Sequence, residues 1–485
     1  MSVLETALSL ALVVAHVAAI LAVLLDDRRQ SNATLAWLFA LVFLPVLGLL
    51  AFVLIGRTQA RRMARRAALV AEHLQPLVAK HSVLSRLDVS DASRTDWRTR
   101  SMLRLGAALA SSPASDGNRA SLLVDAAATY ASMREAILAA RVNVHVEVYV
   151  FRGDETGREL RDLLVETARR GVEVRVVCDG LGSIELPGDF WRPLTDAGGK
   201  AATYRPIWRR LESLISWKRI DFRNHRKLVI VDGRVGFTGG INVGREYLGL
   251  DPAHGRWRDT HLQLEGPAVL SMQLAFGEDW LVAAGETLDS PSYFPEPERA
   301  GDPGAVVQIL DSGPDRDFSA ISYFHVQACA HARHRVWITN PYFVPNSAIR
   351  DALAAAALRG VDVRLLLPER SDSPIVRLAA GAHYPRLLQA GARVFHYAPG
   401  VLHAKTMVVD SWVATVGSAN MDMRSFYLNF ELNAFVFETE LASALARRFE
   451  LDLEQSVEVT AATLRRASLP LRLARSGARL LSPLL

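Results

Sequence analysis

The chain of 485 residues is 50% hydrophobic and carries a formal net charge of +5, with a pI near 9.3. This length and composition exclude a disordered or fibrous protein and predict more than one domain, each with its own core. The basic excess favours anionic partners, either phospholipid head groups or nucleic acid, and charge alone does not decide between them. Cys178 and Cys329 have apolar neighbours, so we expect buried thiols rather than a disulfide or metal ligands.

Two apolar segments predict a transmembrane hairpin within residues 1–60. Residues 6–25 and 35–55 contain no Asp, Glu, Lys or Arg, and each has the length of about 20 residues that crosses a hydrocarbon core. A signal peptide is the alternative for the first segment, but Glu5 and no basic residue precedes it, whereas secretory signals begin with basic residues. Trp37 is either an interfacial anchor or a packing residue against the neighbouring helix.

Positive charge after the second segment predicts its orientation. Five arginines follow it, whereas the connector before it is balanced by its own two aspartates. By the positive-inside rule, the large C-terminal part then faces the cytoplasm. We expect residues 61–120 to be a helical linker, because the segment is helical in pattern and interrupted by prolines.

The remaining chain reads as a duplication. In residues 121–300 and again in 301–460, a helix leads to an apolar strand, then to a helix that ends in Arg-Gly, and then to a second strand. The strands are VHVEVYVF and VEVRVVCD in the first half and VWITNPYF and VDVRLLLP in the second. The predicted fold class is therefore α/β, with two pseudo-symmetric halves whose mixed β-sheets are covered by helices on both faces.

Each half contains one copy of the same polar motif. Chance does not plausibly place a His-x-Lys-x4-Asp pattern followed by a glycine turn and an asparagine at the same offset twice in one chain. The two copies predict one phosphodiester site at a pseudo-two-fold interface. The residues are His225, Lys227, Asp232 and Asn242 in the first half, and His403, Lys405, Asp410 and Asn420 in the second.

The residue types suit attack on a phosphodiester. His and Lys lie two apart on an extended segment, so both side chains point to one face. Each lysine would offset charge on the non-bridging oxygens, and each asparagine would donate further hydrogen bonds. One histidine would attack phosphorus while the other handles protons. Asp232 and Asp410 complete the motif, and we expect them to close the ends of the strands.

Two further carboxylates are candidates to orient the histidines. Asp259 and Glu431 each follow a motif by a comparable interval, and a carboxylate on Nδ1 would leave Nε2 facing phosphorus. A metal ion is disfavoured, since a lysine beside each histidine opposes a cation and no HExxH or CxxC pattern occurs. We expect no cofactor.

At these motifs the chain resembles the phospholipase D superfamily and, within it, the bacterial cardiolipin synthases. The segments that carry the resemblance span nearly the whole chain: AWLFALVFLPVLG, EVYVF, FRNHRKLVIVDG, GGINVG, WRDTHLQLEGPAV, QILDSGPD, ITNPYFVP and RLLSPLL. Gly240 departs from the general superfamily pattern, in which a serine commonly follows the glycine. Any hydroxyl that contacts substrate phosphate would then come from Ser418 alone.

The resemblance implies a metal-independent transfer through a phosphohistidine. His225 would attack one phosphatidylglycerol, glycerol would leave with a proton from His403, and a second phosphatidylglycerol would take the phosphatidyl group to give cardiolipin. The implied location is the bacterial cytoplasmic (inner) membrane, with no nucleic-acid partner. The alternatives are a phospholipase D-type hydrolase, a nuclease, a transphosphatidylase that uses another head group such as phosphatidylethanolamine, and a non-enzymatic scaffold. The hairpin argues against a nuclease, and two complete motifs argue against a scaffold.

Two other segments suit an anionic lipid surface. Trp208 and Trp217 lie among arginines and lysines just before the first motif, and residues 461–485 form a basic amphipathic tail. An ordinary amphipathic helix with snorkelling arginines is the alternative for the first segment. No small-xxx-small pattern indicates an oligomeric state.

Overall fold

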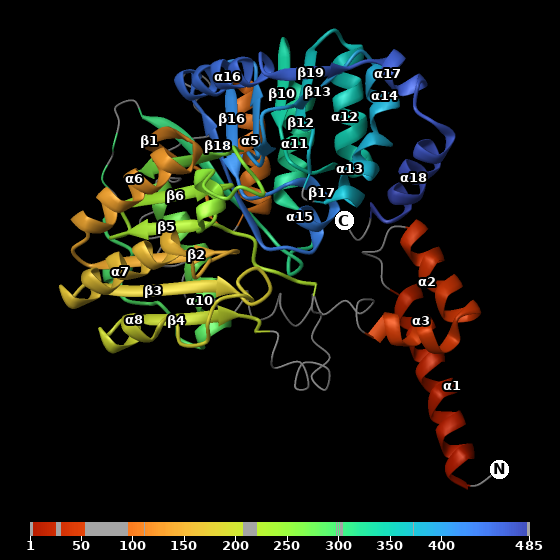
Figure 1. Cartoon of the computed structure of the whole chain (residues 1–485), viewed down its shortest axis with the longest axis horizontal. Helices are drawn as coiled ribbons and strands as arrows, with labels where there is room; N and C mark the ends of the chain where they lie inside the picture. Colours follow the sequence, from red (N-terminus) through yellow and green to blue (C-terminus); the bar gives the residue numbers. More distant parts are fainter. Residues whose placement is uncertain are drawn as a thin grey trace.

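The computed structural model describes residues 3–25, 31–53, 96–110, 112–206, 221–296, 298, 300, 304–371 and 373–482. Figure 1 shows a group of N-terminal helices and, apart from it, a larger body of strands covered by helices. The predicted basic aromatic segment before the first motif and the arginine-rich stretch after the second apolar segment lie largely outside the described residues.

Within the described residues before position 54, the chain forms the helices α1 (Val3–Leu24), α2 (Ser31–Phe43) and α3 (Pro45–Ala51). The second predicted span is divided, since Leu44 leaves helical geometry with φ −127° and ψ 61° and Pro45 opens a new helix. Trp37 packs edge-on against Phe52, just past the end of α3, at 5.5 Å between ring centroids, in a small apolar cluster that includes Ala19 and Val23 of α1. Within the described part of the chain, no helix is long and apolar enough to cross a membrane.

In the part of the chain that the structure describes, the body is built on one sheet of 15 strands, to which the two halves contribute in the same order. The first half runs β1-β8-β6-β5-β2-β3-β4, and the second runs β9-β18-β16-β15-β10-β12-β13-β19. Parallel and antiparallel pairs occur in both halves, so the predicted mixed α/β fold is confirmed.

The strands of the first half are β1 (Ser115–Val124), β2 (Asn143–Val148), β3 (Glu173–Asp179), β4 (Lys200–Tyr204), β5 (Leu228–Val231), β6 (Val235–Gly239) and β8 (Thr260–Glu265). Those of the second are β9 (Ala305–Ser312), β10 (Arg335–Thr339), β12 (Asp362–Pro368), β13 (Arg393–Tyr397), β15 (Thr406–Val409), β16 (Val413–Gly417), β18 (Glu431–Phe437) and β19 (Ser456–Val459).

The halves meet in the sheet where β1 pairs with β9. Only two residue pairs are in register there, Ser115 with Val307 and Asn118 with Ala305, and a bulge lies between them. The predicted linker therefore ends inside a strand, because β1 begins before residue 121. Its helix α5 (Trp97–Leu109) packs on the second half, with Met102 buried in that half's core.

Helices cover both faces of the sheet, as predicted (Figure 1). On one face, α10 (Ala268–Ala284) and α16 (Thr439–Leu453) share a single apolar core that joins Ile230 of the first half to Val408 of the second. The other face carries separate cores for the two halves. Both cysteines are free and buried, which confirms the expectation of structural thiols. Helices that contribute to these separate cores include α6 (Asp125–Ala139) and α7 (Glu155–Arg169) in the first half, and α5, α11 (Ala320–His331) and α12 (Ser347–Leu358) in the second.

The two motif aspartates close the strands that carry the motifs. Asp232 accepts the backbone N–H groups of three residues that lead into β2, at 2.8 to 2.9 Å. Asp410 likewise accepts the N–H groups of three residues that lead into β10, and it also accepts Nη1 of Arg98 at 2.8 Å. Both have a left-handed backbone with φ 54°. Each carboxylate lies at the end of its strand opposite to His and Lys, so we assign both to the fold rather than to the chemistry.

Replacing Asp410 by alanine should lower the free energy of unfolding by about 2–4 kcal/mol, because three backbone N–H groups and a guanidinium lose their acceptor. The shift would be measured as the midpoint of thermal unfolding in detergent. Asp351→Ala is the matched control, since Asp351 is 49% exposed and pairs with arginines at the surface, where such pairs contribute about 1 kcal/mol or less. Equal shifts for both variants would contradict the strand-closing role.

Candidate active site

The two motif histidines lie at the boundary between the halves. His225 precedes β5, and its N–H donates to the backbone oxygen of Phe430 in the second half at 2.9 Å. His403 precedes β15, and its N–H donates to the backbone oxygen of Arg258 in the first half at 2.8 Å. Next to His403, the short strands β7 (Trp257–Arg258) and β14 (Val401–Leu402) pair in parallel. Each motif segment is therefore held by backbone hydrogen bonds to the opposite half.

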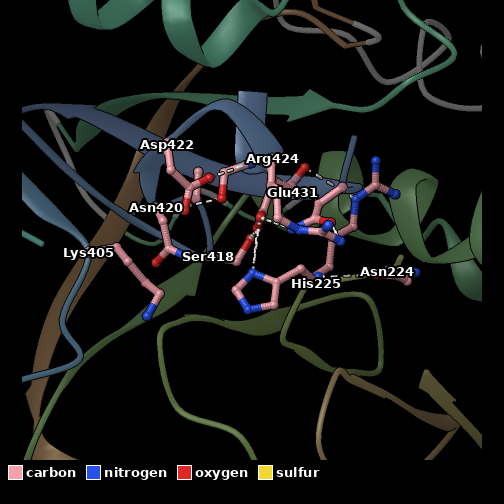
Figure 2. Close-up of polar contacts among 12 residues, drawn as sticks. Asn224, His225, Lys405, Ser418, Asn420, Asp422, Arg424 and Glu431 are labelled. Atoms are coloured by element: carbon pink, nitrogen blue, oxygen red, sulfur yellow. Dashed lines mark hydrogen bonds and ion pairs between the residues drawn. The ribbon is translucent and has the colours of Figure 1, made fainter. Parts of the chain in front are cut away.

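The two candidate orienting carboxylates cross the same boundary. Both carboxylate oxygens of Glu431 lie 3.0 Å from Nδ1 of His225 (Figure 2). Oδ2 of Asp259 lies 2.7 Å from Nδ1 of His403. The comparable intervals along the chain give no sign of this exchange between halves. An ionised carboxylate accepts an N–H, so each ring carries its proton on Nδ1 and offers the Nε2 lone pair.

Burial keeps both rings neutral, and the neighbouring imidazole and lysine of each carboxylate keep it ionised against the effect of burial. Burial lowers the pKa of His225 to about 4, although the charge of Glu431 opposes the shift. Burial, helped by Lys405, also lowers the pKa of His403. Burial alone would raise the pKa of Asp259, but His403 and Lys405 outweigh it and bring that pKa to about 2. Burial alone would raise the pKa of Glu431 as well, but the contact with His225, the charge of Lys227 and the hydrogen bond from Ser418 outweigh it and lower that pKa.

The two lysines bring buried positive charge to the same boundary. Lys227 and Lys405 are each 1% exposed, and each Nζ donates at 2.6 Å to the backbone oxygen of the histidine in its own motif. Burial lowers the pKa of Lys227 to about 7, with Glu431 opposing and Lys405 adding to the shift. Figure 2 shows the side chain of Lys405 beside the ring of His225. The ammonium of Lys405 points toward the side of the ring that faces away from Glu431. An anion between the lysines would relieve their mutual repulsion.

Ser418 contacts a carboxylate rather than open space. Its hydroxyl donates to Oε2 of Glu431 at 2.5 Å and accepts the N–H of Leu432 at 3.0 Å. In the first half the corresponding N–H, of Thr260, donates to Asp259 itself at 2.7 Å. A side chain at Gly240 would overlap the carboxylate of Asp259. The departure from the superfamily pattern is thus accommodated by the shorter acid, and in the second half Ser418 donates to Glu431. The contact of Ser418 with substrate phosphate stays a prediction.

The two motif asparagines differ in their contacts. Oδ1 of Asn242 accepts the N–H of Val150 at 3.0 Å, and its Nδ2 donates to the hydroxyl of Tyr247 at 2.8 Å. The backbone N–H of Asn420 donates to Ser425, and its Oδ1 is buried without a partner among the residues that the structure describes. A side-chain amide carries two N–H groups, so both asparagines retain one that can meet a ligand.

Two buried arginines, which the sequence analysis did not single out, support the carboxylates from behind. Arg226 pairs with Asp279 at 2.6 Å and donates to the backbone oxygen of Glu431 at 3.3 Å. Arg258 pairs with Asp452 at 2.9 Å and donates to the backbone oxygen of Asp259. Strand alternation turns Arg226 away from the face of His225 and Lys227, and an arginine that points inward needs an acid. This inward-pointing arginine on a strand was the signal in the sequence that could have identified Arg226.

Both histidines remain accessible, with side chains 11% and 12% exposed for His225 and His403. Aromatic rings border them: Tyr149 lies 5.0 Å from the ring of His225, and Trp257 lies 5.4 Å from the ring of His403. Across the described ranges, no group of three or more His, Cys, Asp or Glu side chains is arranged to hold a metal ion. Chemically, such an arrangement can supply a neutral nucleophile, a second imidazole for protons and two lysines for an anionic centre.

Comparison with known proteins places this geometry in a family. The family model described as "Cardiolipin synthase, PLD-like domain" matches residues 133–252 and 326–453, and "Phospholipase D-nuclease N-terminal" matches residues 14–57. The cardiolipin synthase of Halalkalibacterium halodurans is 37% identical over 462 residues, which cover 95% of this chain and 90% of the relative. Cardiolipin synthase 2 of Bacillus anthracis is 38% identical over 460 residues, which cover 95% and 88%.

Among solved structures, the phosphatidylserine synthase of Haemophilus influenzae Rd KW20 resembles this chain with a TM-score of 0.57. The alignment covers 76% of this chain and 95% of that one, at 14% identity. At this level of identity the likeness shows a shared fold alone.

The neutral state of His225 predicts how its chemical modification depends on pH. Diethyl pyrocarbonate reacts with neutral imidazole, so the labelling rate of His225 should stay flat from about pH 7.5 to about pH 5.5. A ring with an ordinary pKa of about 6.5 would slow about tenfold over this range. Mass spectrometry of the peptide that contains His225 gives the rate, and a free histidine derivative of known neutral fraction calibrates reagent activity at each pH. A tenfold fall for His225 would contradict the neutral assignment.

Proposed function

This chain belongs to the bacterial cardiolipin synthases, phosphatidyltransferases of the phospholipase D superfamily, and we propose how its own residues carry out the transfer. The phosphatidyl group of one phosphatidylglycerol passes to the terminal hydroxyl of a second, and glycerol is released. The observation that carries the proposal is the crossed arrangement of two imidazoles, each oriented through Nδ1 by a carboxylate of the other half.

The balance of charge at the site suits a phosphodiester. When both lysines are protonated, their two ammoniums match the carboxylates of Asp259 and Glu431, and the site with two neutral histidines sums to about zero. The negative charge of a bound phosphodiester favours this protonated form of Lys227, whose pKa burial lowers to about 7. A phosphodiester adds one negative charge, and one protonated imidazole cancels it. Substrate binding therefore favours uptake of one proton by one of the two rings. The other ring stays neutral and nucleophilic.

In the first step, Nε2 of His225 attacks phosphorus as the bond from phosphorus to the glycerol oxygen breaks. His403 donates its Nε2 proton to that oxygen, and glycerol leaves. Lys227 and Lys405 stabilise the charge on the non-bridging oxygens, with N–H groups of Asn242 and Asn420 as further donors. The product of this step is a phosphatidyl group bound covalently to His225. The order of the two histidines follows the usual order of the family.

In the second step, the terminal hydroxyl of another phosphatidylglycerol attacks the same phosphorus. His403, now neutral, takes the hydroxyl proton as the new phosphorus–oxygen bond forms and the phosphorus–nitrogen bond breaks. His225 returns to its neutral form, and cardiolipin leaves. Asp259 supports both roles of His403, because its negative charge stabilises the imidazolium that each step forms or consumes.

We further propose that the N-terminal helices anchor the enzyme in the bacterial cytoplasmic membrane, with the catalytic halves on the cytoplasmic side. The support is the absence of Asp, Glu, Lys and Arg from residues 6–25 and 35–55. Large apolar side chains also point outward from these helices, among them Leu10, Phe43 and Leu47, which are 65%, 70% and 65% exposed. Lipid is the medium in which such side chains are stable without a protein partner.

The product of the purified full chain with phosphatidylglycerol tests the function. Cardiolipin and glycerol in equal amounts are expected, whereas phosphatidic acid would identify a hydrolase, and a mixed lipid formed in the presence of phosphatidylethanolamine would identify a broader transferase. His225→Asn should lower the rate by about 10⁴-fold or more and form no labelled phosphoenzyme, since the nucleophile is absent. His403→Asn should retain a labelled phosphoenzyme. The opposite pattern would exchange the roles of the two histidines.

The close contact at Gly240 predicts a sensitive position. Gly240→Ala forces the carboxylate of Asp259 to move, and with it the ring of His403. A displacement of about 1 Å in such a group costs on the order of 100-fold in rate. Cardiolipin formation by Gly188→Ala is the control, because a side chain at Gly188 meets nothing within 4 Å. Equal rates for both variants would show that Asp259 does not position His403.

A further inference from the structure

The C-terminal helix α18 (Leu469–Leu480) is docked on the second half by one face only. Ala478 is buried with Val344, Val376 and Ala379 in a small apolar cluster. The guanidinium of Arg475 lies against Gly381 at the end of α13 (Pro374–Gly381). Figure 1 shows α18 beside α13, at the edge of the second half.

The opposite face of α18 carries a stripe of leucines. Leu469, Leu473 and Leu480 are 65%, 64% and 76% exposed. At about 100° per residue, they fall within about 40° of one another and roughly opposite to the docked Ala478. Buried positions usually take such leucines, and a row of three that points away from the protein marks an interaction surface.

Positive charge lies along one side of this leucine stripe. Arg472, Arg475 and Arg479 occupy the sector of the helix between the leucines and the docked face, and no acidic residue follows Glu458 in the chain. An apolar stripe flanked by arginines is the pattern of a helix that lies in the interface of a bilayer with anionic lipids. A second copy of the chain fits less well, because the flanking arginines of two such helices would repel one another.

We propose that α18 lies on the anionic lipid surface of the membrane, with its leucines in the acyl boundary and its arginines at the lipid phosphates. The inference extends the proposed function, which requires a lipid surface but does not say which part of the catalytic body meets it. The surface on which α18 docks is close to the site. Val344, which packs with Ala478, lies in β11 (Phe343–Val344) and pairs in parallel with Asp422 in β17 (Met421–Asp422). The motif residue Asn420 directly precedes β17. Docking of α18 would thus bring the second motif near the lipid head groups.

A fluorophore on α18 tests the proposal in the full chain. Leu473→Cys labelled with an environment-sensitive dye should be quenched by lipids brominated on their acyl chains in nanodiscs that contain phosphatidylglycerol. Both native cysteines are buried and leave the label specific. In phosphatidylcholine nanodiscs the quenching should fall. Arg472→Gln and Arg479→Gln should each weaken docking about fivefold, measured from the quenched fraction.

Leu358→Cys is the matched control, since Leu358 is 74% exposed and ends α12; its label should stay unquenched. Cardiolipin formation is measured in the same nanodiscs, so that loss of docking and loss of activity are separate results. An unquenched label at position 473 in protein that still forms cardiolipin would overturn the inference. So would self-quenching of that label in lipid-free detergent that rises with protein concentration, since a second copy would then cover the leucines.

Discussion

The site depends on one interaction, repeated twice: the hydrogen bond from an imidazole of one half to a carboxylate of the other. His225 is oriented by Glu431 and His403 by Asp259, so neither half holds an oriented histidine by itself. The apolar core shared by α10 and α16 and the short pairing of β7 with β14 keep the halves in register. The orientation of both imidazoles is thus a property of the docked pair of halves.

Docking brings several ionised groups out of water, which costs several kcal/mol per ion unless each is paired. Buried ion pairs behind the orienting carboxylates offset this desolvation cost. Arg226 and Arg258 neutralise Asp279 and Asp452 on the covering helices, and at the same time donate to the backbone at Glu431 and Asp259. The same contacts that make the charges tolerable in the interior fix the segments from which the orienting carboxylates project.

Much of the fold can be predicted from local sequence patterns. Apolar β-branched runs such as the one in β2 and Arg-Gly helix ends occur in both halves, and the repeat places the two motifs at equivalent positions. β1 lacks such a run, since Asp116, Gly117 and Asn118 interrupt it, and its pairing with β8 and β9 is non-local. The sequence does not reveal the exchange of carboxylates for a related reason. The interval from motif to acid is similar in both halves, and only the docking of the halves decides which histidine each acid contacts.

The unequal turns of the two motifs are alternative solutions to one problem. Ser418 with the longer Glu431, and Gly240 with the shorter Asp259, each supply an acceptor for the following backbone N–H and a carboxylate for an imidazole. A change at either turn alone leaves a clash or an unpaired N–H. In the evolution of such a duplicated chain, turn residue and acid are therefore expected to vary together within a half, while the histidine that benefits belongs to the other half. A substitution in one half then affects the histidine of the other half. The two halves therefore stay dependent on each other as their sequences diverge.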